Sequence, residues 1–451
     1  MPLCLSILQR PEPEVLRNHA HYCGLHAYPH RWVEHRGGLP HPSLALAHKY
    51  GLILQNLRQL DEGDWLLFLD ADSVVLRPIP VESLLGEREM LVTDGPSLNS
   101  ADTRVMPNMF VFRNTPRCRE LLDKVLKENG RAIAEVEAAQ EDAVLRTGHV
   151  LPVAATEAGH YVNRSWRFIG WHQPGAQSFV IHLGSLPSQR KDGVLVDEVF
   201  HDLRLQSLLC ARVNAALIDG EPVFPDAGIP AASPEALSSY NTGAEIALVT
   251  LSTHHIASYA AIAEESIRRY CERHGYACHV YRAVPEELGP EMAGSWAKAW
   301  LLGRHLPQHR WVMWVDADML FFNQSLRLEP LCEGRDVLLA RDIGAWPVNS
   351  GLLGFRHTPR NTRLLERLWD RIGQVPDKTA VYSSQGDQYY TIEILREEGL
   401  LGPESVTDFM TINTPYWLAT PDTLLVHVMG LGEPYRSFYM RELDRASLQR
   451  G

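Results

Sequence analysis

The chain contains WLLFLDADSVVLRP from Trp65 to Pro78 and WVMWVDADMLFFNQ from Trp311 to Gln324, and the two stretches share one design. In each, an apolar run that is typical of a buried strand ends in Asp-Ala-Asp. Carboxylates are costly to bury, so an acidic pair at the end of such a strand indicates a site rather than packing. Because the design occurs twice, larger parts of the chain are expected to be duplicated.

Four further pairs of short segments recur at nearly the same spacing. The two acidic motifs lie 246 positions apart, from Asp70 to Asp316, and the other pairs lie between 243 and 248 positions apart in the same order. The pairs are HYCGLHAY (His21–Tyr28) with RYCERHGY (Arg269–Tyr276), MFVFRNTP (Met109–Pro116) with LLGFRHTP (Leu352–Pro359), QED (Gln140–Asp142) with QGD (Gln385–Asp387), and FVIHLGS (Phe179–Ser185) with LLVHVMG (Leu424–Gly430). This period far exceeds that of solenoid repeats, so each copy is expected to be a complete domain.

The length of 451 residues also exceeds what a single hydrophobic core usually supports. We expect a first domain over residues 1–205, a linker region over 206–243 and a second domain over 244–451. Four prolines between residues 222 and 234 prevent a continuous helix or central strand there. The first part of the linker region is either linker or a helix of the first domain.

Strands and helices are predicted to alternate in both copies, which favours an α/β fold with a mainly parallel sheet. In the second copy the predicted strands are Glu245–Ser252, Ala277–Ala283, Trp311–Val315 and Val337–Asp342, and the predicted helices are Ala257–Gly275 and about 295–305. In the first copy they are the strands Leu3–Leu8 and Arg31–Glu34, on either side of a helix near Pro13–Gly24.

Composition narrows the class of protein. A formal net charge of −12 argues against non-specific binding to nucleic acid or anionic lipid. The seven cysteines are odd in number and include no C-x-x-C pair, which favours reduced thiols. The first residues, MPLCLSILQRPEPEVLRN, lack the features of a signal peptide, and no apolar run approaches the ~20 residues that span a bilayer. We therefore expect a cytoplasmic protein with at most peripheral membrane association.

The acidic motifs are candidate metal sites. Ligands of open α/β sheets bind outside the carboxyl ends of the strands, which is where Asp70, Asp72, Asp316 and Asp318 are expected. In extended backbone, residues i and i+2 face the same side, so both carboxylates of a motif can approach one cation. Oxygen ligands suit Mn²⁺ or Mg²⁺ that is shared with substrate phosphates. A single D-x-D motif is more often a solvated turn; the duplication favours the metal interpretation.

Several stretches of the second copy resemble nucleotide-sugar-dependent glycosyltransferases of the GT-A fold. The resemblance is to the fungal and plant α-galactosyl/α-xylosyl/α-mannosyltransferase family and, more distantly, to the glycogenin-like family. It implies two tandem GT-A domains, which are Rossmann-like nucleotide-diphospho-sugar transferase domains. The stretches are SWAKAWLL (Ser295–Leu302), WVDADMLFFN (Trp314–Asn323), VNSGLLGFRHTP (Val348–Pro359), GDQYY (Gly386–Tyr390) and VHVMGLGEPYR (Val426–Arg436).

The resemblance implies roles for residues of the second copy. A metal ion, Mn²⁺ or Mg²⁺, is expected on two carboxylates and one neutral imidazole, and basic residues are expected to offset diphosphate charge. Asp387 and Gln388 are the candidate catalytic residues, with Asp387 near the anomeric carbon. The implied metal ligands are Asp316, Asp318 and His427, the diphosphate residues are Lys298 and Arg436, and the donor-sugar residues are Asp342, Asn349, Asp387 and Gln388. Lys298 is equally expected to cap or solvate its helix. Trp346, Tyr416 and Trp417 are candidates for an acceptor platform, although core packing is more usual for tryptophan.

The first copy carries similar residues with two departures. The corresponding metal ligands are Asp70, Asp72 and His182, the substrate-binding residues are Lys49, Asp94 and Asn108, and the catalytic residue is Asp142. Ala143 stands where the second copy has Gln388, and Ser185 stands where it has Gly430. These departures concern donor identity more than metal binding.

The implied activity is metal-dependent transfer of a sugar from a UDP- or GDP-sugar to a glycan or lipid-linked acceptor, with retention at the anomeric carbon. Two versions remain open, a bifunctional enzyme and one catalytic domain beside a degenerate, acceptor-binding copy. A nucleotidyltransferase ranks third, because QRPEPE and STHHIAS after the first strands lack a Gly-rich basic loop. A non-enzymatic carbohydrate-binding protein would have little need for two metal sites.

Overall fold

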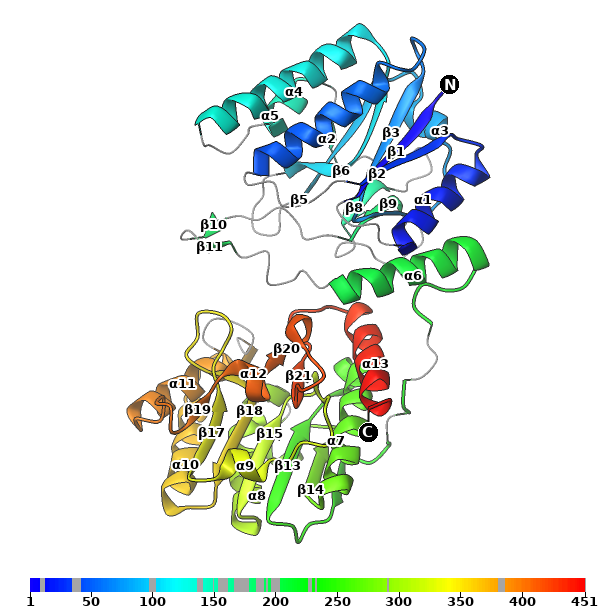
Figure 1. Cartoon of the computed structure of the whole chain (residues 1–451). Coiled ribbons are helices and arrows are strands. Elements are labelled where there is room, and N and C mark those ends of the chain that lie inside the picture. The colour runs from blue at the N-terminus through cyan, green and yellow to red at the C-terminus, as the bar shows by residue number, and fades with distance from the viewer. Residues whose placement is uncertain are drawn as a thin grey trace. The chain divides into compact units, whose positions relative to one another are not determined.

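The computed structural model divides into two compact units, Met1–Pro225 and Asp226–Gly451, which are described separately (Figure 1). The residues that it describes are 1–8, 13–34, 42–96, 103–135, 141–148, 150–152, 161–165, 178–183, 190–191, 194–195, 203–225, 229–231, 233–289, 292–379 and 386–450.

The first unit is built on a six-stranded sheet in the order β2-β1-β3-β6-β5-β7, with a second sheet in the order β4-β9-β8. Its strands are β1 (Leu3–Leu8), β2 (His30–Glu34), β3 (Trp65–Asp70), β4 (Ser73–Val75), β5 (Met90–Pro96), β6 (Thr103–Arg113), β7 (Val150–Pro152), β8 (Tyr161–Ser165), β9 (Ser178–His182), β10 (Arg190–Lys191) and β11 (Val194–Leu195). Its helices are α1 (Pro13–Leu25), α2 (Pro42–Leu57), α3 (Val81–Leu85), α4 (Pro116–Glu135), α5 (Glu141–Leu145) and α6 (Leu203–Asp219).

The second unit is built on a seven-stranded sheet in the order β12-β14-β13-β15-β18-β17-β19, with a second sheet in the order β16-β21-β20. Its strands are β12 (Leu237–Tyr240), β13 (Ile246–Leu251), β14 (Ala277–Tyr281), β15 (Trp311–Val315), β16 (Met319–Phe321), β17 (Val337–Ala340), β18 (Asn349–Arg356), β19 (Val406–Thr407), β20 (Thr414–Pro415) and β21 (Leu425–His427). Its α-helices are α7 (Ala257–His274), α8 (Lys298–His305), α9 (Glu329–Cys332), α10 (Pro359–Gly373), α11 (Asp387–Glu397), α12 (Phe409–Ile412) and α13 (Tyr435–Leu448).

The two units have one topology. In the first, β1 pairs in parallel with β2 and β3, β6 pairs antiparallel with β3 and β5, and β5 pairs in parallel with β7. In the second unit, β13 pairs in parallel with β14 and β15, β18 pairs antiparallel with β15 and β17, and β17 pairs in parallel with β19. These pairings match those of the first unit one for one, and β12 is added at one edge. The small sheets also correspond, because β9 and β21 each pair antiparallel with the strand after the acidic motif.

The predicted α/β fold is confirmed, but the sheets are mixed rather than mainly parallel. β17 and β18 pair antiparallel, as do β15 and β18. The connection over residues 341–348 is too short for the crossover that two parallel strands require, so β18 must return antiparallel. The prediction of parallel strands is correct for β14, β13 and β15.

The apolar runs before the acidic motifs are buried on both faces of their sheets. In β15, Val312 and Trp314 belong to the core on the side of α8 and α10, whereas Trp311, Met313 and Val315 belong to the core that includes α7 and β16. Residues of β3 divide between two cores in the same alternating way. A strand covered on both faces needs apolar residues at every position, which explains why these runs do not alternate with polar residues.

The expected linker region is folded at both ends. Its first part continues α6, which is held to α1 by a 2.9 Å hydrogen bond from Asn18 Nδ2 to Asn214 Oδ1. Near the end of this region, β12 pairs with β14 at the edge of the seven-stranded sheet. The boundary between the two compact units lies at Pro225, inside the expected region.

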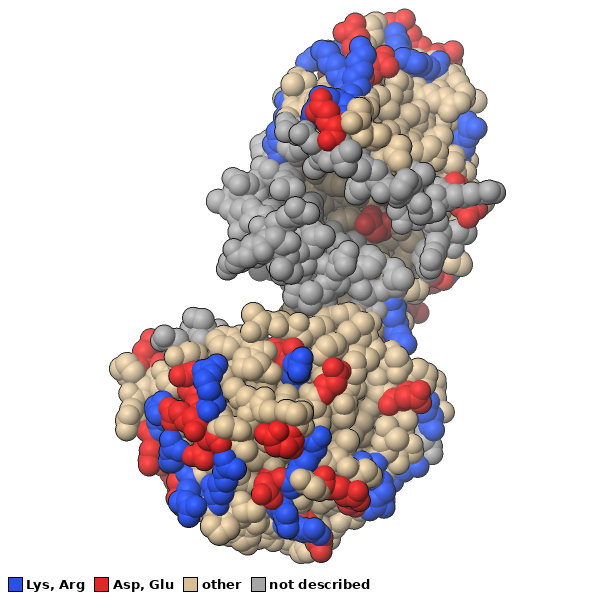
Figure 2. Space-filling model, turned by 60° about the vertical axis from the view of Figure 1, so that its left-hand side comes forward, with Lys and Arg blue, Asp and Glu red and all other residues tan. Residues whose placement is uncertain are grey.

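The face of the molecule shown in Figure 2 carries both acidic and basic side chains. On the second unit, acidic and basic side chains lie among one another rather than in large patches of one sign (Figure 2). Ion pairs between α10 and α11, such as Arg367 with Glu397 at 2.7 Å, account for part of this pattern. Among the described residues, no helix combines the length and the apolar character needed to cross a membrane.

Candidate functional site

The acidic motif of the second unit forms a tight turn between β15 and β16. The backbone N–H of Met319 donates to the carbonyl of Asp316 at 3.1 Å, and the N–H of Asp316 donates to the carbonyl of Gly351 at 2.9 Å. A turn therefore replaces the extended backbone expected from the sequence. It still brings the carboxylates of Asp316 and Asp318 to the same side, at the carboxyl end of β15.

The third member of the cluster arrives on β21. Because β16 pairs antiparallel with β21, Met319 lies opposite His427. His427 Nε2 is 3.1 Å from Asp318 Oδ1, and one ligand atom each of Asp316, Asp318 and His427 lies within 4.8 Å of the other two. His427 Nδ1 donates to Asn413 Oδ1 at 2.7 Å, which leaves the Nε2 lone pair directed at the carboxylates. Two carboxylates and one neutral imidazole at this spacing fit a divalent cation such as Mn²⁺ or Mg²⁺.

Burial and ion pairing together set the charges of this cluster. Burial raises the pKa of Asp316, and the opposing effect of Lys298 does not reverse the increase. Burial would also raise the pKa of Asp318, but His427 and Arg436 lower it overall. Burial would lower the pKa of His427, but the carboxylates of Asp318 and Asp316 raise it overall. A proton on His427 therefore competes with a cation for the same site.

Lys298 is the first residue of α8 and is buried, with 6% of its surface exposed. Its ammonium lies 3.0 Å from Asp316 Oδ1 and 2.9 Å from Asp387 Oδ2, and it donates to the carbonyl of Ser350 at 3.3 Å. Burial would lower the pKa of Lys298, but the two carboxylates raise it overall. Lys298 is therefore neither a solvated residue nor a helix cap; it joins the two acidic groups of the site.

Arg436 lies in the first turn of α13 and reaches the other side of the acidic motif. Its Nη1 is 3.5 Å from Asp318 Oδ2 and donates to the hydroxyl of Tyr259 at 3.0 Å. The guanidinium carbon lies 4.8 Å from the centroid of the Tyr259 ring, a cation–π contact. A fixed positive charge of this kind beside two carboxylates can hold an anionic group of a substrate.

The residues predicted for the donor sugar gather around Ser350. Gln388 accepts from the N–H of Ser350 at 3.0 Å through Oε1 and donates to Asp342 Oδ2 at 3.3 Å through Nε2. Ser350 Oγ donates to Asp387 Oδ2 at 3.4 Å. Asn349 Oδ1 accepts from the N–H of Gly351 at 2.8 Å, and a Cβ atom at Gly351 would meet His427 Cε1 at 2.8 Å.

Sequence reasoning missed four residues of this site. Ser350 acts through its backbone and hydroxyl, Asn413 orients His427, Tyr259 holds Arg436, and Trp314 Nε1 donates to Asp316 Oδ1 at 2.6 Å. Trp314 stands two residues before Asp316, so its proximity was a usable signal. Ser350 lies within VNSGLLGFRHTP, one of the stretches that carry the resemblance, whereas Asn413 and Tyr259 lie in none of them.

The proposed acceptor platform is only partly supported. Trp346 is 36% exposed and packs edge-on against Tyr389, with ring centroids 6.4 Å apart. Tyr416 is 1% exposed and lies edge-on to Tyr439. Its assignment to an acceptor surface is therefore wrong, because a buried ring cannot stack on a sugar.

The first unit repeats two of the ion pairs. Lys49 Nζ lies 3.3 Å from Asp70 Oδ2, and His182 Nε2 lies 2.8 Å from Asp72 Oδ2. Burial would lower the pKa of His182, but Asp72 raises it overall. Within the described residues, however, Asp70, Asp72 and His182 do not form a group whose ligand atoms all lie within 4.8 Å.

The first unit also differs from the second in the residue that stands in the place of Gly351. The register of β3 on β6 places Asn108 where the second unit has Gly351 rather than Asn349. Asn108 Nδ2 donates to Ser73 Oγ at 2.9 Å and to Asn163 Oδ1 at 3.2 Å, so its amide is committed to a buried network. The side chains of Asp94 and Asp142, two further predicted residues, lie outside the described part of the structure, as does Ser185.

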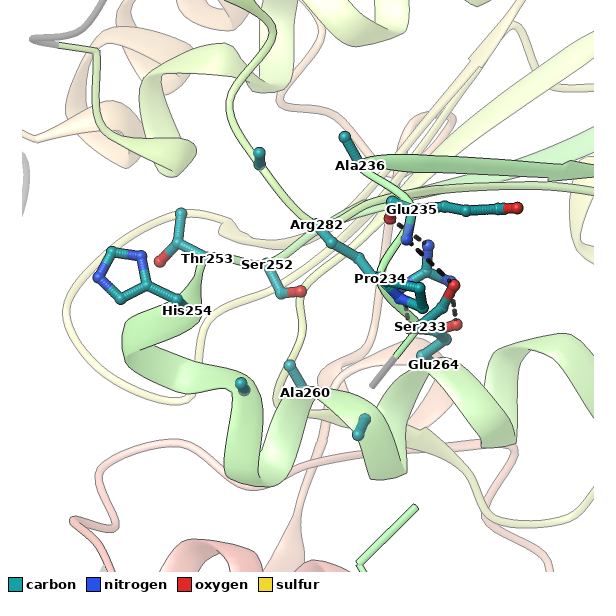
Figure 3. A pocket seen from close by; sticks show the side chains of 13 residues that line it. Ser233, Pro234, Glu235, Ala236, Ser252, Thr253, His254, Ala260, Glu264 and Arg282 are labelled. Carbon is teal, nitrogen blue, oxygen red and sulfur yellow. Dashed lines mark hydrogen bonds and ion pairs between the residues drawn. The ribbon is translucent and has the colours of Figure 1, made fainter. Parts of the chain in front are cut away.

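A separate pocket lies at the carboxyl ends of β13 and β14, between α7 and the segment before β12, with a cavity volume of about 280 Å³ (Figure 3). Arg282 crosses it, paired with the Glu264 carboxylate and donating to the carbonyl of Glu235 at 2.8 Å. Small side chains such as Ala257 and Ala260 line the helix side. The pocket contains none of the predicted site residues, but it opens at the same edge of the sheet.

Comparisons with known proteins point to one class of enzyme. The sequence model of the galactosyl transferase GMA12/MNN10 family matches residues 244–341, a range that includes Lys298, Asp316 and Asp318. This match supports sugar transfer as the type of reaction. No curated protein matches the chain.

Three of the solved structures that are similar to this chain are described as glycosyltransferases or a galactosyltransferase. A glycosyltransferase involved in glycosylation of the major capsid of PBCV-1 is 19% identical, with a TM-score of 0.36, over 43% of this chain and 98% of its own. The glycosyltransferase GlyE of Streptococcus pneumoniae is 13% identical, with a TM-score of 0.31, over 46% of this chain and 62% of its own. The galactosyltransferase LgtC, solved with donor and acceptor sugar analogues, is 12% identical, with a TM-score of 0.32, over 45% of this chain and 95% of its own.

Proposed function

We propose that the second unit is a GT-A-type, metal-dependent glycosyltransferase. It moves a hexosyl group from a UDP- or GDP-sugar to a glycan or lipid-linked acceptor, with retention at the anomeric carbon. The observation that carries this proposal is the compact arrangement of Asp316, Asp318 and His427 at the end of β15. The two aspartates lie inside the segment that the family model matches, and His427 reaches them from β21.

In this proposal one group of residues binds the metal ion and the diphosphate of the donor. Asp316, Asp318 and His427 hold Mn²⁺ or Mg²⁺, which supplies positive charge for the departing nucleoside diphosphate. Arg436 adds a second positive charge on the far side of Asp318.

The sugar is bound on the side of Asp387. Asp342, Asn349 and Gln388 provide the paired donors and acceptors that hydroxyl groups require. Asp387 lies next to the sugar and pairs with Lys298 at 2.9 Å, so that its carboxylate favours the oxocarbenium-like state in which positive charge develops at the anomeric carbon.

We place the nucleoside of the donor in the pocket beside α7. This pocket opens at the carboxyl ends of β13 and β14, the same edge of the sheet at which the acidic motif follows β15. Filling it by Ala257→Leu is expected to raise KM for the nucleotide-sugar while leaving kcat nearly unchanged.

The first unit is proposed to be a degenerate copy that binds the acceptor. It keeps the ion pairs of Lys49 with Asp70 and of Asp72 with His182. Its candidate metal-ligand atoms are less closely grouped, however, and Asn108 occupies the place of Gly351. The bifunctional alternative rests on the presence of both carboxylates and the histidine.

One experiment tests both parts of the proposal. UDP- and GDP-sugars are screened for Mn²⁺-dependent hydrolysis and transfer with the full chain and with Asp318→Asn and Asp72→Asn. Asp318→Asn is expected to abolish turnover, and Asp72→Asn is expected to raise KM for the acceptor only. Loss of a distinct transfer in Asp72→Asn would establish two active units, and full activity of Asp318→Asn or resistance to EDTA would refute the metal assignment.

A further inference from the structure

Three buried histidines of the second unit meet beside its seven-stranded sheet, at the end opposite the acidic motif. His279 is on β14, His305 ends α8, and His309 precedes β15 by two residues. Their exposed fractions are 2%, 5% and 4%. His309 Nδ1 donates to the carbonyl of Ala244, just before β13 begins, so the cluster lies at the amino-terminal ends of β13 and β15.

The rings are oriented by their outer hydrogen bonds. His309 Nδ1 bonds the carbonyl of Ala244 at 2.7 Å, His279 Nδ1 bonds Ser239 Oγ at 2.9 Å, and His305 Nε2 bonds the hydroxyl of Tyr281 at 2.8 Å. Each outer nitrogen therefore faces an oxygen that can accept its proton. An oxygen partner on the far nitrogen is the usual support of a histidine that binds a metal ion.

The inner nitrogens face one another. His279 Nε2 and His309 Nε2 are 3.2 Å apart, and one nitrogen of each of the three rings lies within 4.8 Å of the other two. His305 Nδ1 is buried and has no hydrogen-bond partner. An unpaired nitrogen in a closed interior costs free energy that a bound ion would recover.

Burial keeps two of the three rings in the neutral form that a metal ligand needs. Burial lowers the pKa of His279 to about 4 and that of His305 to about 3, so both are neutral at pH 7. A 3-10 turn over Leu306–Gln308 follows the end of α8 at His305 and returns the chain so that His309 lies beside the other two rings. Sites made of imidazole alone suit zinc and its neighbours among the transition metals rather than Mg²⁺ or Ca²⁺.

The first unit shows that the fold does not require this cluster. Phe68 of β3 and Trp314 of β15 are equivalent positions. Leu5 of β1 lies between Phe68 and Arg31, and Val249 of β13 lies between Trp314 and His279 in the same way, so Arg31 is the counterpart of His279. At the corresponding place in the first unit, Arg31 Nη1 donates to Asn56 Oδ1 at 2.7 Å, which is an ordinary polar pair. Only the second unit brings imidazoles together here, within the part of the chain that the structure describes.

We propose that His279, His305 and His309 form a structural site for a zinc-class transition metal ion, separate from the acidic site. The ion ties β14 to the end of α8 and to the segment that enters β15. His279 and His309 bind it through Nε2 and His305 through Nδ1. The rings of His279 and His305 stack with centroids 3.8 Å apart, so binding turns the His305 ring about its one hydrogen bond, to Tyr281.

The test uses the full chain carrying Asp316→Asn and Asp318→Asn, so that the acidic site does not contribute. Zinc content is measured by mass spectrometry after dialysis, zinc affinity by titration, and Tm with added Zn²⁺ or with EDTA. One zinc per chain is expected, with a higher Tm in Zn²⁺ than in EDTA. Co²⁺ in place of zinc is expected to give the absorption bands of a tetrahedral nitrogen site.

The matched variant is His305→Phe, which keeps an aromatic ring in the stack and removes the nitrogen. It is expected to weaken zinc binding at least 10-fold and to make Tm insensitive to EDTA; His309→Gln serves in its place if it does not fold. A parent protein without zinc in the presence of micromolar Zn²⁺, or unchanged zinc affinity in the variant, would overturn the proposal. None of these readouts depends on sugar transfer, so they separate this proposal from the proposed function.

Discussion

The ammonium of Lys298 lies 2.9 Å from Oδ2 of Asp387, although the two residues come from the first turns of different helices, α8 and α11. The same ammonium lies 3.0 Å from Oδ1 of Asp316. One buried positive charge thus connects the acidic motif to the carboxylate proposed to act beside the anomeric carbon. Its removal would leave two carboxylates close together in a buried site.

Lys298→Met is expected to abolish transfer and to destabilise the second unit by about 3–5 kcal/mol, because breaking a buried ion pair leaves charges uncompensated. Lys49→Met in the first unit is the matched comparison, since Lys49 faces the single carboxylate of Asp70 at 3.3 Å. Urea unfolding and turnover should show the larger loss for Lys298→Met. Equal effects of the two substitutions would contradict the bridging role of Lys298.

The placement of Gly351 gives a second prediction. A Cβ atom there would meet His427 Cε1 at 2.8 Å and Asn349 Oδ1 at 2.9 Å, so Gly351→Ala must displace the imidazole. We expect the concentration of Mn²⁺ for half-maximal activity to rise about 10- to 100-fold. Gly354→Ala, on the same strand, would press on Leu338 at 3.1 Å and is expected to lower Tm without changing the Mn²⁺ requirement. The assignment fails if both variants keep the Mn²⁺ dependence of the parent.

Much of this site was predictable because its residues follow strong local signals. The runs before Asp70 and Asp316 are apolar at every position, so their strand structure and their acidic ends can be identified without a structure. His427 was predictable because it has a counterpart in His182 at the expected spacing. Duplication supplied information that a single copy lacks.

The remaining contacts depend on packing between distant segments. The hydrogen bonds of Ser350 and Asn413 could not be read from the sequence, because they arise from the antiparallel return of β18 and from the loop before β20. The correspondence of Asn108 with Gly351 follows from strand register and agrees with the offset of 243 between Met109–Pro116 and Leu352–Pro359.

Asn413 is expected to control metal affinity without touching the ion. Its Oδ1 accepts from His427 Nδ1 at 2.7 Å and so keeps the Nε2 lone pair directed toward the acidic motif. Asn413→Ala should weaken activation by Mn²⁺ about 10- to 100-fold, with kcat largely restored at saturating Mn²⁺. Asn323→Ala removes an amide that bonds Pro421 instead and serves as the control. Failure of excess Mn²⁺ to restore kcat would show that Asn413 acts in another way.

Tyr259 supports Arg436 in two separable ways. Its hydroxyl accepts a 3.0 Å hydrogen bond, and its ring lies 4.8 Å from the guanidinium carbon. Tyr259→Phe keeps the ring contact and is expected to raise KM for the donor only a few-fold. Tyr259→Ala removes both contacts and should raise it about 10-fold or more, in line with a cation–π contribution of roughly 1–2 kcal/mol. Equal KM values for the two variants would locate the whole effect in the hydrogen bond.

His19 of the first unit makes a prediction for stability against pH. It is buried between Ser6 and Ser73, donates through Nε2 to the Ser73 carbonyl at 2.8 Å, and burial lowers its pKa to about 4. The unfolded chain therefore binds a proton at this residue near pH 6.5, which the folded chain takes up only near pH 4. Stability from neutral His19 is complete above pH 6.5 and is lost progressively as the pH falls toward 4, by on the order of 3 kcal/mol. Urea midpoints of wild type and His19→Gln should converge as the pH falls across this range and keep a constant difference from pH 7 to 8. A constant difference at all of these values would show that His19 does not titrate as its burial requires.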